Sequence, residues 1–235
     1  MSDFLSFDTL SLHAGQTLDS EFGSRAQPIH QTTSYVFTDT DTASSLFNLE
    51  RGGHVYNRIS NPTVGVLEQR VAALEGGSAS VCVSSGMSAV FCALTALVSQ
   101  GDHVVASANM YGGNISLLKN TLPRFGITAT FVDPTDIKQI ESAIQENTKI
   151  IFGELIGNPG LSVMDIEAVS KICSKHHLPL MIDGTFNTPY LCRCFEYGAN
   201  IIVHSLTKWM GGHGTSIGGV VVDGGNFDWG KDCLL

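Results

Sequence analysis

The chain has 235 residues, of which 43% are hydrophobic and only 15% are charged, and its formal net charge is −9 at pH 7. This hydrophobic content excludes an intrinsically disordered chain, and the acidic balance argues against nucleic acid or an anionic membrane surface as the main partner. No run of about 18 apolar residues predicts a membrane span, and residues 1–16 lack the pattern of a secretory signal. We therefore expect one large domain in a soluble, cytoplasmic protein.

The cysteines predict neither a disulfide framework nor a metal site. Six are present without any CxxC pair, at Cys82, Cys92, Cys173, Cys192, Cys194 and Cys233. In a chain of this size we expect them to be reduced thiols that mostly fill the core. The spacing of Cys192 and Cys194 matches no familiar pattern of zinc ligands, so no metal is predicted.

Regular secondary structure is predicted from Asn61 onward, whereas the first sixty residues show little periodicity. A helix is indicated after Asn61, because Pro62 suits the first helical position and apolar residues then recur every three or four positions until Gly76-Gly77. Helix-length stretches then separate six short apolar runs rich in β-branched residues, at 79–83, 103–106, 128–132, 149–155, 179–183 and 201–204.

A seventh apolar run, 218–222, follows the sixth after a stretch too short for a full crossover helix, so it should run antiparallel. The alternation of strands and helices predicts an α/β fold. We expect a seven-stranded, mostly parallel sheet with one antiparallel strand and with helices on both faces.

Polar groups follow four of the predicted strands, at the carboxyl edge where open α/β sheets bind ligands. Residues 84–88 precede an apolar helical stretch, whose first backbone N–H groups make an anion site. The loop after the next strand carries the ring of Tyr111, Asp183 ends a strand, and Lys208 follows another among hydroxyls and glycines. Each of these groups alone has an ordinary structural explanation: residues 84–88 and Asp183 as caps, Tyr111 as a packed ring, and Lys208 as a solvated side chain. The whole set at one edge favours a binding site.

This set suits pyridoxal phosphate, which needs a cradle for its phosphate, a face for ring stacking, an acid partner for its ring nitrogen and a lysine for a Schiff base. Nucleotide-binding loops fit less well, because no GxxxxGK[ST] occurs and the glycine run 211–219 precedes a predicted strand instead of a helix. A triad hydrolase would carry GxSxG after a strand, and none occurs.

Five segments carry motifs that occur together in one enzyme family. They are residues 56–63 (YNRISNPT), 84–88 (SSGMS), 157–159 (GNP), 183–190 (DGTFNTPY) and 205–219 (SLTKWMGGHGTSIGG). Together they resemble the Cys/Met-metabolism branch of the fold-type I pyridoxal-phosphate enzymes, over Leu10 to about Trp229. The resemblance implies an aspartate-aminotransferase-like large domain over residues 61–235, and an extended inter-subunit segment over residues 1–60.

Carried over residue by residue, the resemblance implies a role for each matching position. Lys208 would hold the cofactor covalently, Asp183 would pair with its ring nitrogen, and Tyr111 would stack on its ring. The other cofactor-binding residues would be Gly86, Met87, Ser205 and Thr207 at the phosphate and Asn158 near the ring hydroxyl. Tyr56 and Arg58 would reach the phosphate of a neighbouring subunit, which implies a homodimer or a homotetramer.

Residues 205–219 are most similar to the sulfhydrylase subgroup of the family. This similarity implies a transsulfuration enzyme of methionine and cysteine biosynthesis. O-acetyl-L-homoserine and sulfide would give L-homocysteine and acetate, with Lys208 removing the Cα proton and Tyr111 acting as an acid–base partner. Alternatives are another sulfur donor, a cystathionine γ-synthase, γ-elimination of the methionine γ-lyase type, or a non-catalytic cofactor-binding remnant. Family members continue into a carboxy-terminal small domain, which we expect these 235 residues to lack.

Overall fold

The computed structural model describes residues 5–232, and the chain divides into two compact units between Val71 and Ala72, here called unit 1 and unit 2 in chain order. Helices α1 (Phe7–His13) and α2 (Thr40–Phe47) lie in unit 1, and α3 (Pro62–Glu75) runs across the boundary between the units. Asn61 caps α3, because its side-chain oxygen accepts the backbone N–H groups of Thr63 (2.8 Å) and Val64 (3.4 Å). The helix predicted after Asn61 is therefore present, and Asn61 caps it.

Unit 1 buries few of its large apolar side chains. Leu10 and Val71 are buried, whereas Leu18, Phe22 and Val36 are 84%, 81% and 100% exposed. The residues between α1 and α2 form mainly turns, bends and irregular chain. Large apolar side chains exposed in this number are typical of a surface that binds another protein surface.

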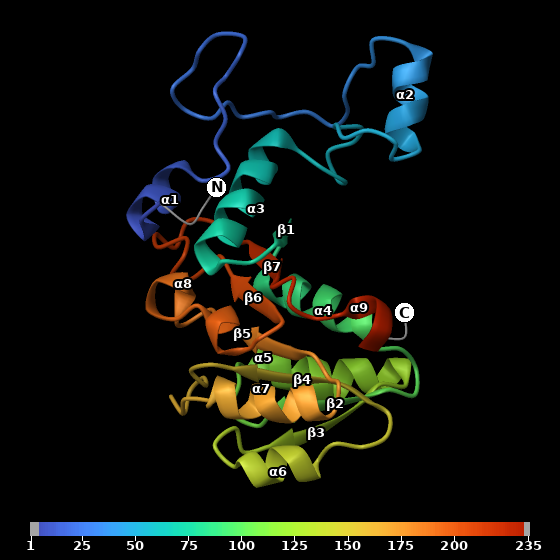
Figure 1. The fold of residues 1–235 in the computed structure, drawn as a ribbon, viewed down its shortest axis with the longest axis vertical. Helices are drawn as coiled ribbons and strands as arrows, with labels where there is room; N and C mark the ends of the chain where they lie inside the picture. The colour runs from blue at the N-terminus through green and yellow to red at the C-terminus, as the bar shows by residue number, and fades with distance from the viewer. Residues whose placement is uncertain (1–4, 233–235) are drawn as a thin grey trace. The chain divides into compact units, whose positions relative to one another are not determined.

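Unit 2 is built on a seven-stranded sheet (Figure 1). The strands are β1 (Ala79–Val83), β2 (His103–Ser107), β3 (Thr128–Val132), β4 (Thr148–Glu154), β5 (Leu180–Asp183), β6 (Ile201–Ser205) and β7 (Gly219–Asp223). Their order in the sheet is β1-β7-β6-β5-β4-β2-β3. Strand β7 is antiparallel to both β1 and β6, and all other neighbours are parallel. The predicted sheet is confirmed, and every strand ends within one residue of its predicted range.

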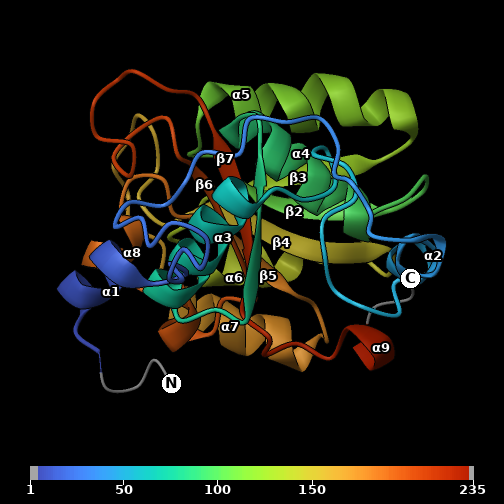
Figure 2. The same cartoon turned by 90° about the horizontal axis from the view of Figure 1, so that it is seen from above.

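Helices cover both faces of this sheet (Figure 2). One face carries α4 (Gly86–Leu97), α5 (Gly112–Ser116) and the short helices η1 (Leu117–Thr121) and η2 (Leu122–Phe125); the other carries α6 (Ile137–Ser142) and α7 (Ile166–Lys175). The remaining short helices are α8 (Thr188–Leu191), η3 (Cys194–Tyr197) and α9 (Trp229–Asp232). Because both faces are covered, the middle residues of the central strands are apolar, and Val104, Ile150 and Ile202 are completely buried.

The cysteines differ in part from the prediction. All those that the structure describes are thiols, as expected, but only Cys173 and Cys194 are buried. Cys92 is exposed because α4 packs against the sheet through its other face, where Ala89, Ala93 and Leu94 lie. Cys82 and Cys192 are partly exposed, and Cys233 lies outside the described residues. Core filling therefore accounts for two of these cysteines and not for most of them.

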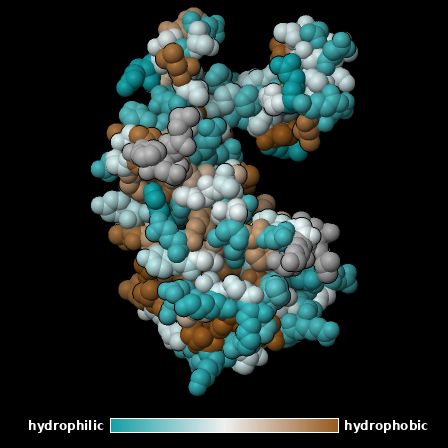
Figure 3. Space-filling model, in the orientation of Figure 1, coloured by the Kyte–Doolittle hydropathy of each residue, from teal (hydrophilic) through white to brown (hydrophobic). Residues whose placement is uncertain are grey.

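The surface of unit 2 is mostly hydrophilic on the face shown in Figure 3, with separate apolar patches between the polar side chains. Its exposed large apolar residues include Phe125, Tyr190 and Trp209. Among residues 5–232, no helix has both the length and the apolar character that crossing a bilayer requires.

Candidate functional site

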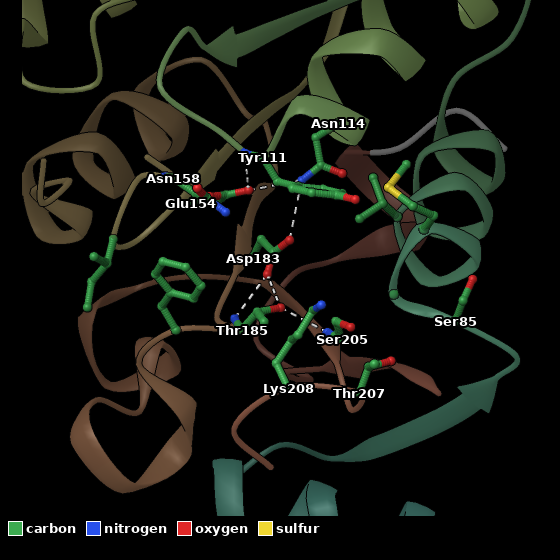
Figure 4. A pocket seen from close by; sticks show the side chains of 15 residues that line it. Ser85, Tyr111, Asn114, Glu154, Asn158, Asp183, Thr185, Ser205, Thr207 and Lys208 are labelled. Carbon is green, nitrogen blue, oxygen red and sulfur yellow. Dashed lines mark hydrogen bonds between the residues drawn. The ribbon is translucent and has the colours of Figure 1, made fainter. Parts of the chain in front are cut away.

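A cavity of about 410 Å³ lies at the carboxyl ends of the parallel strands of unit 2 (Figure 4). Eight of the predicted site residues line it, namely Gly86, Met87, Tyr111, Asn158, Asp183, Ser205, Thr207 and Lys208. The lining is completed by residues to which the sequence analysis gave no individual role, namely Ser85, Val90, Asn114, Glu154, Ile156, Thr185 and Phe186. The structure thus brings the polar loops together at the sheet edge where they were expected.

The start of α4 forms one wall of the cavity. Ser85 caps the helix, since its Oγ accepts the backbone N–H of Ser88 at 3.1 Å. Gly86 packs directly on the end of β6, so that a β-carbon at this position would lie 2.6 Å from the β-carbon of Ser205. Only glycine lets the helix start approach Ser205 this closely, and the Thr207 side chain lines the same cavity. A helix amino terminus facing two hydroxyls is suited to a phosphate.

Asp183 ends β5, and hydrogen bonds from two residues hold its carboxylate. Oδ1 accepts the backbone N–H (3.0 Å) and the hydroxyl (2.6 Å) of Thr185, and Oδ2 accepts the side-chain N–H of Asn114 (3.3 Å). The Thr185 hydroxyl in turn accepts the backbone N–H of Ser205 at 2.9 Å, which ties the ends of β5 and β6 together. These donors fix the orientation of a carboxylate at the cavity wall.

Lys208 extends into the cavity from the loop after β6 (Figure 4). The loop is held on both sides of this residue. The Thr207 hydroxyl bonds to the backbone N–H (3.2 Å) and C=O (3.3 Å) of Gly218, and the Lys208 N–H donates to the C=O of Ser205 (3.3 Å). A primary amine presented in this way is a suitable nucleophile for a carbonyl group.

Tyr111 and Asn158 come from the loops after β2 and β4. The backbone N–H groups of both residues donate to the carboxylate of Glu154, at 2.7 Å for Tyr111 and 3.2 Å for Asn158. Tyr111 is 51% exposed and lines the cavity, where its ring is suited to stack on a bound ring.

Glu154 is the main residue that the sequence analysis missed. It ends β4, is only 7% exposed, and burial together with the charge of Asp183 raises its pKa to about 7. The one signal for it in the sequence is a carboxylate inside an apolar run, 149–155, in which every residue was assigned to a strand. A buried acid of that kind needs donors, and two of its three donors come from Tyr111 and Asn114, which are distant in sequence.

Tyr56 and Arg58 lie in unit 1 and are not among the residues that line the cavity. The guanidinium carbon of Arg58 is 5.4 Å from the centroid of the Tyr56 ring, a cation–π contact, and Tyr56 is 42% exposed. Their role at the phosphate of a neighbouring subunit stays a prediction.

The groups around the cavity fit pyridoxal phosphate. The close packing of Gly86 on Ser205 leaves a cradle that a side chain at this position would obstruct. Asp183 and Lys208 supply the acid and the amine that the pyridine ring and the aldehyde require.

The comparisons with known proteins agree with this chemistry. Residues 8–234 match the family model of the Cys/Met metabolism PLP-dependent enzymes, a slightly longer stretch than the motifs predicted. The chain is 50% identical to the homocysteine synthase of Schizosaccharomyces pombe over 227 residues, which is 96% of this chain and 53% of that protein. It is 50% identical to the O-acetyl-L-homoserine sulfhydrylase of Leptospira meyeri over 224 residues, 95% of this chain and 51% of that protein. The chain therefore spans about half the length of these relatives.

Solved structures share the fold. A Campylobacter jejuni protein assigned as an O-acetylhomoserine (thiol)-lyase superposes with a TM-score of 0.91 at 42% identity, over 93% of this chain and 54% of that one, and contains N'-pyridoxyl-lysine-5'-monophosphate. Cystathionine gamma-lyase of Lactobacillus plantarum superposes with a TM-score of 0.86 at 34% identity, over 93% of this chain and 55% of that one. The family expected from the motifs is confirmed: the chain belongs to the Cys/Met metabolism family of PLP-dependent enzymes.

Proposed function

We propose that this chain contributes the cofactor-binding domain of an enzyme that converts O-acetyl-L-homoserine and sulfide to L-homocysteine and acetate in methionine and cysteine biosynthesis. The observation that carries the proposal is the meeting of Lys208, Asp183 and the start of α4 around one cavity. The identity of 50% to an O-acetyl-L-homoserine sulfhydrylase supports this reaction over the other reactions of the family.

Each residue at the cavity has a proposed part in holding the cofactor. Lys208 binds it covalently, Asp183 pairs with its ring nitrogen, and Tyr111 stacks on its ring. The phosphate lies at Gly86, Met87, Ser205 and Thr207, and Asn158 meets the ring hydroxyl. Bound in this way, pyridoxal phosphate supplies an electron sink for the charge that develops at the substrate Cα.

The residues of this chain carry the proton transfers. The amine of Lys208, once substrate has displaced it, removes the proton from Cα. Asp183 keeps a proton on the ring nitrogen, because its carboxylate is fixed by the Thr185 donors. The hydroxyl of Tyr111 holds or donates a proton beside the leaving acetate.

We also propose that the enzyme is a cytoplasmic homodimer or homotetramer, with residues 1–60 as an inter-subunit segment and residues 61–235 as the cofactor-binding large domain. Exposed apolar side chains such as Phe22 and Val36 support the burial of unit 1 against another subunit. In that assembly Tyr56 and Arg58 bind the phosphate in the neighbouring subunit's site.

The test is chemical trapping followed by an assay of products. Borohydride reduction of the protein with pyridoxal phosphate, then peptide mapping, should give a pyridoxyl adduct on Lys208. Adducts on Lys119, Lys171 or Lys175 without any on Lys208 would refute the assignment.

The whole enzyme, supplied with O-acetyl-L-homoserine and sulfide, should form homocysteine and acetate. Lys208→Ala should abolish this activity, and Lys171→Ala, which removes an exposed partner of Glu167, should leave it unchanged. Release of a 2-oxo acid and ammonia in place of homocysteine would show γ-elimination instead.

A further inference from the structure

Glu154 lies among the loops that line the cavity, although the reaction proposed above assigns it no part. It is the last residue of β4, and its Cα is paired with that of Asp183 in the ladder between β4 and β5. Two carboxylates therefore stand side by side at the same level of neighbouring parallel strands, and Glu154 is the more deeply buried of the two.

Three N–H groups from two loops converge on the Glu154 carboxylate (Figure 4). Oε1 accepts the backbone N–H of Tyr111 at 2.7 Å and the side-chain N–H of Asn114 at 3.1 Å. Oε2 accepts the backbone N–H of Asn158 at 3.2 Å. Buried N–H groups are costly to leave without an acceptor, so this one side chain joins the loop after β2 to the loop after β4.

The Asn114 amide extends this network to Asp183. Its nitrogen lies between the two carboxylates, 3.1 Å from Glu154 Oε1 and 3.3 Å from Asp183 Oδ2. Asn114 is 1% exposed, and its own oxygen has no hydrogen-bond partner within residues 5–232. The amide is therefore oriented by its nitrogen alone, and the position of Glu154 decides where that nitrogen points.

The charges of the pair agree with this arrangement. Burial and the charge of Asp183 raise the pKa of Glu154 to about 7. Asp183 accepts both Thr185 donors on its other oxygen, Oδ1. The raised pKa means that Glu154 holds a proton more readily than an ordinary carboxylate beside this neighbour.

We propose that Glu154 is a positioning residue for the groups that contact the cofactor. It fixes the backbone at Tyr111 and Asn158, the residues assigned to the pyridine ring and its hydroxyl. Through Asn114 it fixes the carboxylate of Asp183. This inference rests on the proposed function, because it takes pyridoxal phosphate as the molecule that these groups address.

The test compares Glu154→Gln and Glu154→Ala with the parent chain and with Glu146→Gln, a control that neutralises an exposed carboxylate just before β4. The first measurement is amide hydrogen exchange at Tyr111 and Asn158 without cofactor. The second is the dissociation constant for pyridoxal phosphate. The third is the pH dependence of the absorption bands of the bound cofactor.

Glu154→Ala removes the acceptor of both backbone amides, so their exchange should become at least about tenfold faster and cofactor affinity should fall about tenfold or more. Glu154→Gln keeps one acceptor oxygen, so its effects should be intermediate. Asn114→Ala disconnects only Asp183, so it should shift the absorbance titration while the two amides exchange as in the parent. Glu146→Gln should match the parent in every measurement.

The inference would be overturned if both Glu154 variants matched the parent in amide exchange, in affinity for pyridoxal phosphate and in the pH dependence of cofactor absorption. If Glu154→Ala does not fold, Glu154→Gln decides, since it has nearly the same shape. Borohydride labelling of the parent separates the two proposals. Failure to label Lys208 would refute the proposed function, whereas labelling with parental behaviour of the Glu154 variants would refute only the positioning role.

Discussion

Replacing Gly86 by alanine tests whether the start of α4 must touch the end of β6 to form the phosphate cradle. The new β-carbon would lie 2.6 Å from the β-carbon and 2.9 Å from the α-carbon of Ser205, whereas ordinary contact begins at 3.4 Å. The two segments must therefore separate by at least about 0.8 Å. Overpacking of this kind typically costs about 1–3 kcal/mol of stability.

The effect on cofactor binding should be larger than the effect on folding. A shift of this size lengthens hydrogen bonds from the helix start or from Ser205 to the phosphate, and a bond to a charged group contributes about 1.5–3 kcal/mol. Affinity for pyridoxal phosphate should fall about ten- to a hundredfold. Absorbance titration measures the affinity, and urea unfolding of the cofactor-free protein measures the stability.

Gly65→Ala is a matched control, because Gly65 lies within α3 and a β-carbon there meets nothing within 4 Å. It should gain up to about 1 kcal/mol from better helix propensity and leave cofactor affinity unchanged. Without the clash, Gly86→Ala would gain stability in the same way, since Gly86 is also helical. A Gly86→Ala protein as stable as the control, with parental affinity, would therefore refute the proposed cradle.

Three further predictions concern other buried groups. Asp183→Asn should slow deuterium exchange at the substrate Cα about a hundredfold, because an amide cannot hold the ring nitrogen charged; exchange followed by NMR would show this. The imidazole of His204 lies 2.5 Å from the carboxylate of Glu75, and both side chains are completely buried. His204→Ala leaves Glu75 without this partner, so the free energy of unfolding measured in urea should fall by about 3–5 kcal/mol. A fall below about 1 kcal/mol would contradict this. The pKa of Glu154 is about 7 in the folded protein, against the ordinary 4.5. Between these pH values the folded protein keeps a proton that the unfolded chain releases. This group should therefore lower the unfolding free energy by up to about 3 kcal/mol as pH rises from 4.5 to 7. Unfolding at several pH values should show this slope in the parent and not in Glu154→Gln.

The strands could be predicted because they are buried on both faces. A buried parallel strand is a continuous apolar run, so the residues of β4 or β6 differ clearly from the polar helices and loops around them. The antiparallel direction of β7 followed from the short connection after β6. The order of the strands was not predicted, because pairing depends on contacts between segments far apart in sequence.

The predicted site residues were those that follow a strand and carry a distinctive group. Asp183 and Lys208 interrupt apolar or glycine-rich sequence, so they stand out without any knowledge of their neighbours. Glu154 and Asn114 do not, because Glu154 lies inside the predicted apolar run 149–155 and Asn114 lies inside the short helix α5. Asn114 is 40 residues from Glu154 and 69 from Asp183, and only the folded sheet brings the three together.

Sheet order explains why the cavity forms where it does. The groups assigned to the ring follow β2, β4 and β5, and those assigned to the phosphate come from β6 and from α4, which follows β1. Neighbouring strands are about 4.8 Å apart, so one small cofactor can reach the ends of β4, β5 and β6. The start of α4 is one strand further away, because β7 lies between β1 and β6. It reaches the site because β7 begins with Gly219, where a β-carbon would lie 2.0 Å from the carbonyl oxygen of Ser85. Because Gly219 and Gly86 have no β-carbon, the start of α4 can cross β7 and contact Ser205. The site therefore depends on these two glycines as well as on the polar groups that line the cavity.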